Sequence, residues 1–126
     1  MRVMIVEDEA LIAMHLEMVV VSLGHEVCAF AATAPEAVAR AIECSPDVAL
    51  MDIRLARGSS GVDAARDVYA LRGLRCIFLS ANLDEATRAA VRSYEPIAFI
   101  NKPVLPLALQ RALDRAGSTG RSEAKP

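Results

Sequence analysis

The sequence predicts an α/β fold, a (βα)5 doubly wound domain with a five-stranded parallel sheet. Short apolar runs rich in β-branched residues alternate five times with longer helical stretches, which is typical of βα units stacked on a parallel sheet. A length of 126 residues suits one domain with one core. We expect that domain at residues 1–116. Residues 117–126 are small and polar, and they are expected to form a disordered tail.

The predicted strands are residues 3–6, 27–30, 48–51, 77–79 and 98–100. The first helix is expected to end at Leu23, because Gly24 is a usual residue just after a helix. The second helix is expected to begin with a capping box, in which Thr33 is followed three residues later by Glu36, with Pro35 in the first turn.

The remaining three helices follow from shorter signals. The third is expected after Gly61, and the fourth after Asn82, with Glu85 three residues on. The fifth begins near Pro106, because proline suits the first turn of a helix. No second domain, and so no DNA-binding output domain, is predicted, and any output would come from a surface of this one domain.

Charge and hydropathy exclude several partners. The net charge of −2 leaves no basic footprint for nucleic acid. The amino terminus lacks a signal-peptide pattern, and no apolar run approaches the ~20 residues of a membrane span. We therefore expect a cytoplasmic protein without a nucleic-acid or membrane partner. Cys28, Cys44 and Cys76 are odd in number and lack CxxC spacing, so buried free thiols are expected rather than disulfides or a zinc site.

Polar side chains follow four of the five predicted strands. Glu7 and Asp8 follow the first, Asp52 the third, Ser80 the fourth and Lys102 the fifth. Right-handed crossovers bring the carboxyl ends of parallel strands to one edge, where open α/β sheets bind their ligands. Carboxylates with room for water suit Mg²⁺. With a cation present, a carboxylate can act as a nucleophile toward phosphorus, and a lysine can hold a phosphoryl oxygen.

Four short motifs, Val-Glu7-Asp8-Glu, Met-Asp52-Ile-Arg-Leu, Leu-Ser80-Ala and Lys102-Pro, stand in this order at predicted strand ends. Together they resemble the receiver family of two-component signalling, whose likeness covers residues 1–116. The resemblance implies a flavodoxin-like strand order of 2-1-3-4-5. It also implies a phosphoacceptor that takes a phosphoryl group from a sensor histidine kinase or a histidine phosphotransfer protein, without enzymatic activity beyond its own phosphorylation and dephosphorylation.

The same resemblance assigns roles to individual residues. Asp52 would be the phosphoacceptor. Asp8, Asp52 and the main-chain carbonyl of Arg54 would bind Mg²⁺ directly, and Glu7 through water. Lys102 would contact the phosphoryl group, with a cis peptide bond to Pro103. Ser80 and Phe99 would couple phosphorylation to a change of surface.

Two positions depart from the pattern of the family. Ala56 stands where proline is usual, and Gly61 comes one residue later than in the commonest spacing. The loop at residues 56–60 is therefore expected to be longer and more mobile. Arg54 and Asn82 occupy positions that tune the lifetime of the phosphoryl group in the family.

Each residue also has a plainer interpretation. Asp8 alone could cap the first helix, and Asp52 could end a strand in a turn. Ser80 alone is more often a turn hydroxyl, Lys102 a solvated charge, and Phe99 a core residue. Only their combination favours function.

Three other functions compete with the receiver interpretation. A phosphatase of the haloacid dehalogenase type would need a second aspartate where Arg54 stands, and also a cap domain. A flavodoxin-like cofactor binder would need a phosphate-cradling loop where Glu7 and Asp8 would repel phosphate. A degenerate receiver that only binds partners conflicts with the intact set of site residues.

The predicted first helix carries a second apolar stripe opposite the one that faces the sheet. Its members are spaced three, four and three residues apart: Leu11, Met14, Met18 and Val21. Exposed apolar stripes usually mark contact sites. We expect a docking face for the helical bundle of a kinase or for a second copy of the chain, extended by Leu107. Alternatively, the fifth helix or the tail covers part of it.

Overall fold

The fold was obtained as a computed structural model, which describes residues 1–55 and 58–124. Every predicted strand and helix is confirmed. The elements, in chain order, are β1 (Arg2–Val6), α1 (Ala10–Ser22), β2 (Glu26–Ala31), α2 (Ala34–Cys44), β3 (Val48–Asp52), α3 (Gly61–Arg72), β4 (Cys76–Ser80), α4 (Glu85–Val91), the short 3-10 helix η2 (Arg92–Tyr94), β5 (Ala98–Asn101) and α5 (Pro106–Ala124).

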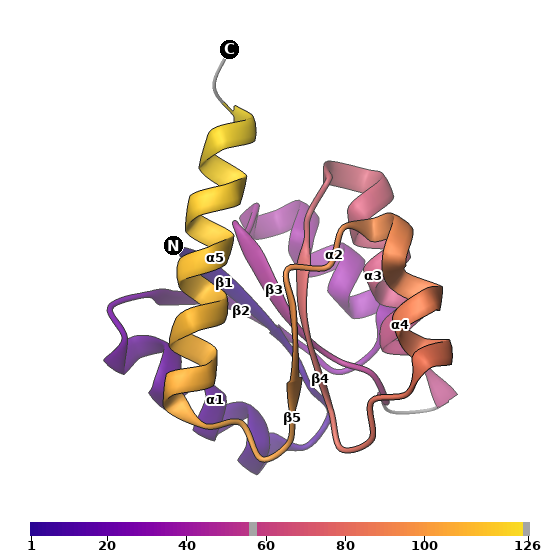
Figure 1. The fold of residues 1–126 in the computed structure, drawn as a ribbon, viewed down its shortest axis with the longest axis horizontal. Helices are drawn as coiled ribbons and strands as arrows, with labels where there is room; N and C mark the ends of the chain where they lie inside the picture. The colour runs from indigo at the N-terminus through magenta and orange to yellow at the C-terminus, as the bar shows by residue number, and fades with distance from the viewer. Residues whose placement is uncertain (56–57, 125–126) are drawn as a thin grey trace.

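The five strands form one parallel sheet in the order β2-β1-β3-β4-β5, as predicted. Helices α1 and α5 cover one face, and α2, α3 and α4 cover the other (Figure 1). The chain therefore reverses its winding direction after β2, and the carboxyl ends of β1 and β3 lie next to each other at the reversal.

Alternation along the central strands divides the apolar interior into two layers. In β1, Val3 and Ile5 pack toward α1 and α5, whereas Met4 and Val6 pack toward α2 and α3. Successive side chains of a strand point to opposite faces, so a sheet covered on both sides requires apolar residues at every position. β1, β3 and β4 meet that requirement except at Arg2, which begins β1, and at Asp52 and Ser80, which end β3 and β4 at the carboxyl edge of the sheet.

The helix termini follow the predicted signals except at α4. Thr33 Oγ1 accepts a hydrogen bond from Glu36 N at 3.3 Å, and Glu36 Oε1 accepts one from Ala32 N at 2.8 Å. Helix α4 begins later than the expected start after Asn82. Its cap is Asp84, whose Oδ1 accepts a hydrogen bond from Thr87 N at 2.8 Å, and the backbone N–H of Asn82 donates to Ser80 Oγ at 3.0 Å.

Helix α5 continues as far as Ala124, eight residues past the predicted end of the domain at Ala116. The disorder predicted for residues 117–126 stays a prediction, and residues 125–126 lie outside the described part of the chain. Ala56, part of the loop expected to be longer and mobile, also lies outside it. No helix within the described residues is long and apolar enough to cross a membrane.

Candidate functional site

The site lies at the carboxyl edge of the sheet. Glu7 directly follows β1, Asp52 is the last residue of β3, Ser80 is the last of β4, and Lys102 directly follows β5. The parallel register places Val6 beside Met51, and therefore brings the ends of the two central strands to the same level. Residues that are separated by up to 95 positions in sequence thus meet at one place.

Lys102 joins two buried carboxylates. Its Nζ lies 3.1 Å from Asp52 Oδ2 and 3.3 Å from Glu7 Oε1. Glu7 and Asp52 are each only 5% exposed. The second oxygen of each carboxylate accepts a backbone amide: Asp52 Oδ1 from Arg54 N at 3.3 Å, and Glu7 Oε2 from Glu9 N at 3.1 Å. The plainer interpretation of Lys102, a solvated charge, therefore does not apply.

Asp8 completes a cluster of three carboxylates with Glu7 and Asp52. One oxygen from each residue lies within 4.8 Å of the others. Asp8 is exposed and does not cap α1: the residue at the cap position is Glu9, which makes no side-chain capping bond. One carboxylate of the cluster is therefore exposed to solvent and two are buried. Together they offer the hard oxygen ligands that a divalent cation prefers.

The electrostatics of the site favour added positive charge. Burial raises the pKa of Glu7 to about 7; the charge of Asp52 acts in the same direction, and the amide of Glu9 and the charge of Lys102 oppose it. Burial opposes the charge of Lys102, but the hydrogen bond and charge of Asp52, followed by those of Glu7, raise the pKa of Lys102 above its usual value. One lysine does not compensate three carboxylates, so the site can hold a metal ion.

A pocket of about 430 Å³ opens over these groups. Asp8, Asp52, Arg54, Ser80 and Lys102 all line it, so five of the predicted site residues share one space. Ser80 is buried, and its Oγ accepts a hydrogen bond from Asn82 N at 3.0 Å, as in the turn interpretation.

Three further lining residues, Asn82, Asp84 and Thr87, come from α4 and the loop before it. Sequence reasoning noted Asn82, but it did not single out Asp84 or Thr87 as site residues. Thr87 lies within a helix and is not adjacent to a strand end, so no sequence signal marked it. The spacing of Asp84 and Thr87 could have predicted where the helix begins, because Asp is a usual N-cap residue. It could not have predicted that the helix lies beside the site.

The backbone around the site is tightly packed. Lys102 N donates to the carbonyl oxygen of Ser80 at 2.9 Å, and the peptide bond between Lys102 and Pro103 is cis. Gly61 N donates to Ile53 O at 2.7 Å, and a Cβ on Gly61 would lie 2.8 Å from the carbonyl carbon of Asp52. Only glycine fits there, because real Cβ atoms do not approach backbone atoms so closely.

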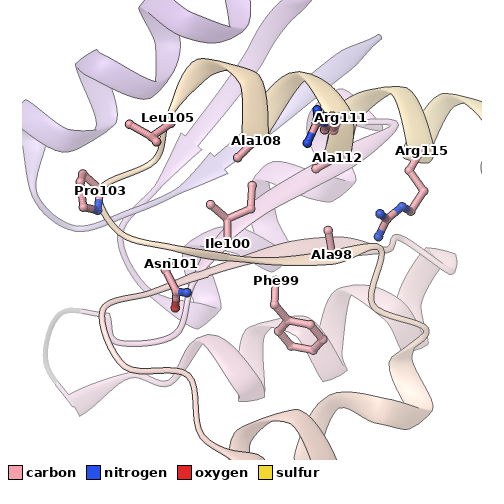
Figure 2. A pocket seen from close by; sticks show the side chains of 10 residues that line it. All are labelled: Ala98, Phe99, Ile100, Asn101, Pro103, Leu105, Ala108, Arg111, Ala112 and Arg115. Atoms are coloured by element: carbon pink, nitrogen blue, oxygen red, sulfur yellow. The ribbon is translucent and has the colours of Figure 1, made fainter.

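Phe99 is one of the residues that line a second pocket, but its ring lies on the other face of β5. Its ring stacks on Phe78 with centroids 5.6 Å apart, and the guanidinium of Arg88 in α4 lies 4.7 Å from its centroid. Figure 2 shows Phe99 pointing away from α5, whereas Ile100 points toward α5. The pocket between β5 and α5 measures about 410 Å³ and begins next to the site, at Pro103.

The outer stripe of α1 is exposed along its whole length. Leu11 is 81% and Met18 70% exposed, and Met14 and Val21 are each more than half exposed. Leu107, at the start of α5, is also exposed. Among the described side chains, α5 does not cover the stripe, whereas the inner face of α1 buries Leu16 and Val20 completely.

Comparisons with known proteins agree with this geometry. Residues 3–114 match the family described as response regulator receiver domain. The chain is 41% identical over 116 residues to the phyllosphere-induced regulator PhyR of Methylorubrum extorquens, covering 91% of this chain and 43% of PhyR. It is 30% identical over 120 residues to the chemotaxis protein CheY of Thermotoga maritima, covering 90% and 95% of the two chains.

Solved structures show the same similarity. The signal receiver domain of a modulated diguanylate cyclase from Desulfovibrio desulfuricans G20 superposes with a TM-score of 0.88 at 33% identity, covering 97% of each chain. The chain spans less than half the length of PhyR.

Proposed function

This chain belongs to the response regulator receiver family, and on that premise we propose that it is a cytoplasmic protein that accepts a phosphoryl group on Asp52 from a sensor histidine kinase or histidine phosphotransfer protein. The proposal includes no other catalysis than its own phosphorylation and dephosphorylation. The observation that carries it is the placing of a buried carboxylate, Asp52, beside an ammonium group, Lys102, on the wall of an open pocket.

In the proposed transfer, an oxygen of Asp52 attacks phosphorus as the bond from phosphorus to the donor imidazole breaks. The imidazole leaves with the electron pair and takes up a proton. Lys102 holds one phosphoryl oxygen as a point charge, and Ser80 donates its hydroxyl to another. Burial keeps water away from the carboxylate, which strengthens each of these electrostatic contacts.

Asp8, Asp52 and the carbonyl of Arg54 would hold Mg²⁺, and Glu7 would act through water. The three clustered carboxylates support this, because one lysine leaves their negative charge uncompensated. The pKa of Glu7 is raised mainly by burial and further by the charge of Asp52, so a nearby cation would favour its charged form. When bound, Mg²⁺ supplies positive charge that stabilises the transferring phosphoryl oxygens.

Ser80 and Phe99 would carry the change outward. The hydroxyl oxygen of Ser80 accepts a hydrogen bond from the backbone N–H of Asn82. When Asp52 is phosphorylated, this hydroxyl turns toward the phosphoryl group, and the loop before α4 moves with it. The ring of Phe99 packs against the guanidinium of Arg88 in α4, so a shift of α4 would change this contact and the position of the ring. The surface formed by α4, β5 and α5 is therefore the proposed output surface.

The exposed stripe of α1, which consists of Leu11, Met14, Met18 and Val21, would receive the helical bundle of the kinase. The stripe begins four residues after Glu7, so a partner seated on it reaches the pocket that contains Asp52. Methionine side chains suit an adaptable contact between helices. Leu107 would extend the same surface, and a second copy of the chain is the competing occupant.

The test is labelling by acetyl phosphate in the presence of Mg²⁺. The intact mass should rise by one phosphoryl group, and chelation of the metal should suppress the rise. Asp52→Asn should abolish labelling, whereas Asp67→Asn, which changes a partly exposed aspartate on α3, should label as the wild type does. Labelling of Asp52→Asn at the wild-type level would refute the assignment of the acceptor.

A further inference from the structure

Two of the three cysteines meet at the end of the molecule opposite the phosphoacceptor site. Cys28 lies in β2 and Cys44 is the last residue of α2, and their Sγ atoms are 3.0 Å apart. All three cysteines are free thiols, as predicted, but Cys28 and Cys44 are half-buried and only Cys76 is fully buried. No sequence signal predicted the contact, because the two residues are 16 positions apart and belong to no motif.

A β-bulge brings Cys28 toward α2. In the pairing of β1 with β2, Val3 lies opposite Val27 and Met4 lies opposite Ala29, so Cys28 is an extra residue without a partner on β1. Val27 packs toward α1 and α5, whereas Ala29 packs toward α2 and α3. The bulge thus interrupts the alternation of the strand, and the side chain of Cys28 reaches the end of α2.

The surroundings hold the two thiols in place. Arg2 Nη2 donates to the carbonyl oxygen of Cys44 at 2.8 Å, and Arg2 Nη1 lies 3.3 Å from Glu26 Oε2 at the start of β2. One side chain of β1 therefore ties the end of α2 to the strand that carries Cys28. A disulfide requires sulfur atoms about 2.05 Å apart, so closure needs a sulfur displacement of about 1 Å, within the reach of side-chain rotation.

We propose that Cys28 and Cys44 form a peroxide-sensitive dithiol that closes to an intramolecular disulfide. The thiol of Cys44 releases a proton, its thiolate attacks one oxygen of hydrogen peroxide, and the O–O bond breaks to give a sulfenic acid and hydroxide. The hydroxide takes up the released proton and leaves as water. The sulfur of Cys28 then attacks the sulfenic sulfur, the S–O bond breaks, and a second water leaves with the proton of Cys28. Two thiols are oxidised by two electrons, and one peroxide is reduced to two waters.

The proton that leaves with the second water comes from Cys28. Burial, together with its hydrogen bond to Cys44, raises the pKa of Cys28 to about 12, so Cys28 holds this proton at neutral pH until the bond between the two sulfurs forms. Cys76 is an internal control, because burial raises its pKa to about 12 and it lies on β4 away from the pair.

The bond would fasten the edge strand β2 to α2 without reaching Asp52. Cys28 and Cys44 lie toward the amino edge of the sheet, where Arg2 begins β1, whereas Asp52 lies at the carboxyl edge. A cross-link over 16 positions limits the unfolded chain. Oxidation should therefore stabilise the domain and leave acetyl phosphate labelling intact.

The experiment treats the purified, reduced chain with hydrogen peroxide, and follows intact mass, thiol count and Tm. The wild type and Cys76→Ser should each lose two hydrogens and two thiols, and Tm should rise by roughly 10 °C. Dithiothreitol should reverse both changes. Cys28→Ser and Cys44→Ser should show neither the mass loss nor the rise in Tm.

Peptide mapping of the oxidised wild type identifies which cysteines are joined. It needs no variant, so the test holds even if a cysteine variant folds poorly. A fragment that joins Cys28 to Cys44 supports the proposal. Retention of all thiols, a bond to Cys76, a bond between two chains, or conversion to sulfinic acid without a cross-link would each overturn it.

Discussion

The carboxyl edge of the sheet and the outer stripe of α1 depart in opposite directions from the usual division between interior and surface. At the edge, Glu7 and Asp52 are buried charged groups that contact one cation, Lys102. On α1, Leu11 and Met18 are large apolar side chains left in solvent. Burying charged groups costs free energy of folding, and leaving large apolar side chains in solvent gains none, so neither arrangement is explained by stability alone.

The two regions differ in the interactions that keep their side chains in position. The edge is fixed by close backbone approach and by paired charges, so its residues depend on one another. The side chains of the stripe are each more than half exposed, so they contribute little to the packing of the fold. Substitutions at the edge should therefore change both stability and function, whereas substitutions on the stripe should change function alone.

Of the substitutions made at the carboxyl edge and on the stripe, Gly61→Ala is expected to lose the most stability. The added methyl would meet the backbone of Asp52, which cannot move without disturbing β3. We expect a loss of about 3 kcal/mol or more in the free energy of unfolding, measured by urea denaturation, together with weaker labelling by acetyl phosphate. Gly73→Ala is a control for the substitution itself, because its φ of 68° is strained but no atom lies within 4 Å of its Cβ. Equal losses in the two variants would argue against close packing at the edge.

The next effect is a dependence of stability on pH in the metal-free protein. The pKa of Glu7 rises on folding from 4.5 to about 7, so the folded chain binds more protons than the unfolded chain between these values. Stability should therefore fall as pH rises from 4.5 to 7, by up to about 3 kcal/mol.

Urea denaturation in EDTA at several pH values measures this fall. Glu7→Gln should remove most of it, and Glu43→Gln, at an exposed residue of α2, should retain it. If Glu7→Gln kept the full slope, the burial of the Glu7 charge would not be its cause.

A smaller loss is expected for Lys102→Ala. Without metal, the substitution leaves Glu7 and Asp52 without their shared cation, at a cost of about 2 kcal/mol. Mg²⁺ should restore most of that stability, because metal binds the folded state and replaces the missing charge. Unfolding curves in EDTA and in Mg²⁺ measure the difference, and the same loss in both would show that Lys102 does not compensate the acidic cluster.

Lys102→Ala also tests the link from the site to the surface. The variant should still bind Mg²⁺ but should lose the change of surface on activation, because no ammonium group holds the phosphoryl oxygen. Retention of normal signalling by this variant would contradict the role proposed for Lys102.

The smallest change of stability is expected for the double variant Met14→Glu with Met18→Glu. Its free energy of unfolding should stay within about 0.5 kcal/mol of the wild type, because both side chains are exposed. Acetyl phosphate should still label Asp52, whereas transfer from the kinase should fall about tenfold or more. Leu16→Glu, on the buried face of the same helix, should unfold the domain.

Three results would contradict this account of α1. Unfolding of the double variant would assign the stripe to the core. Wild-type transfer from the kinase would remove it from the docking surface. A change of oligomeric state without a change of transfer would assign it to a second copy of the chain.

The amino-acid sequence by itself determined the fold and the strand-end residues of the site. Continuous apolar runs must be buried on both faces of a sheet, and crossover chirality then leaves one edge for Glu7, Asp52, Ser80 and Lys102. Residues placed directly after strands could therefore be predicted together before any distance was known. Most helix boundaries were found by the same local chemistry, since caps act within a few residues.

Only the tertiary structure decided contacts that no local pattern encodes. It showed that Asp8 does not cap α1, that Thr87 of α4 lines the pocket, and that Cys28 touches Cys44 through a bulge. It also showed that the stripe on α1 is uncovered. Each depends on how separate elements pack, and packing is set by the sum of many weak contacts over the whole chain, whereas strands and caps are set by neighbours in sequence.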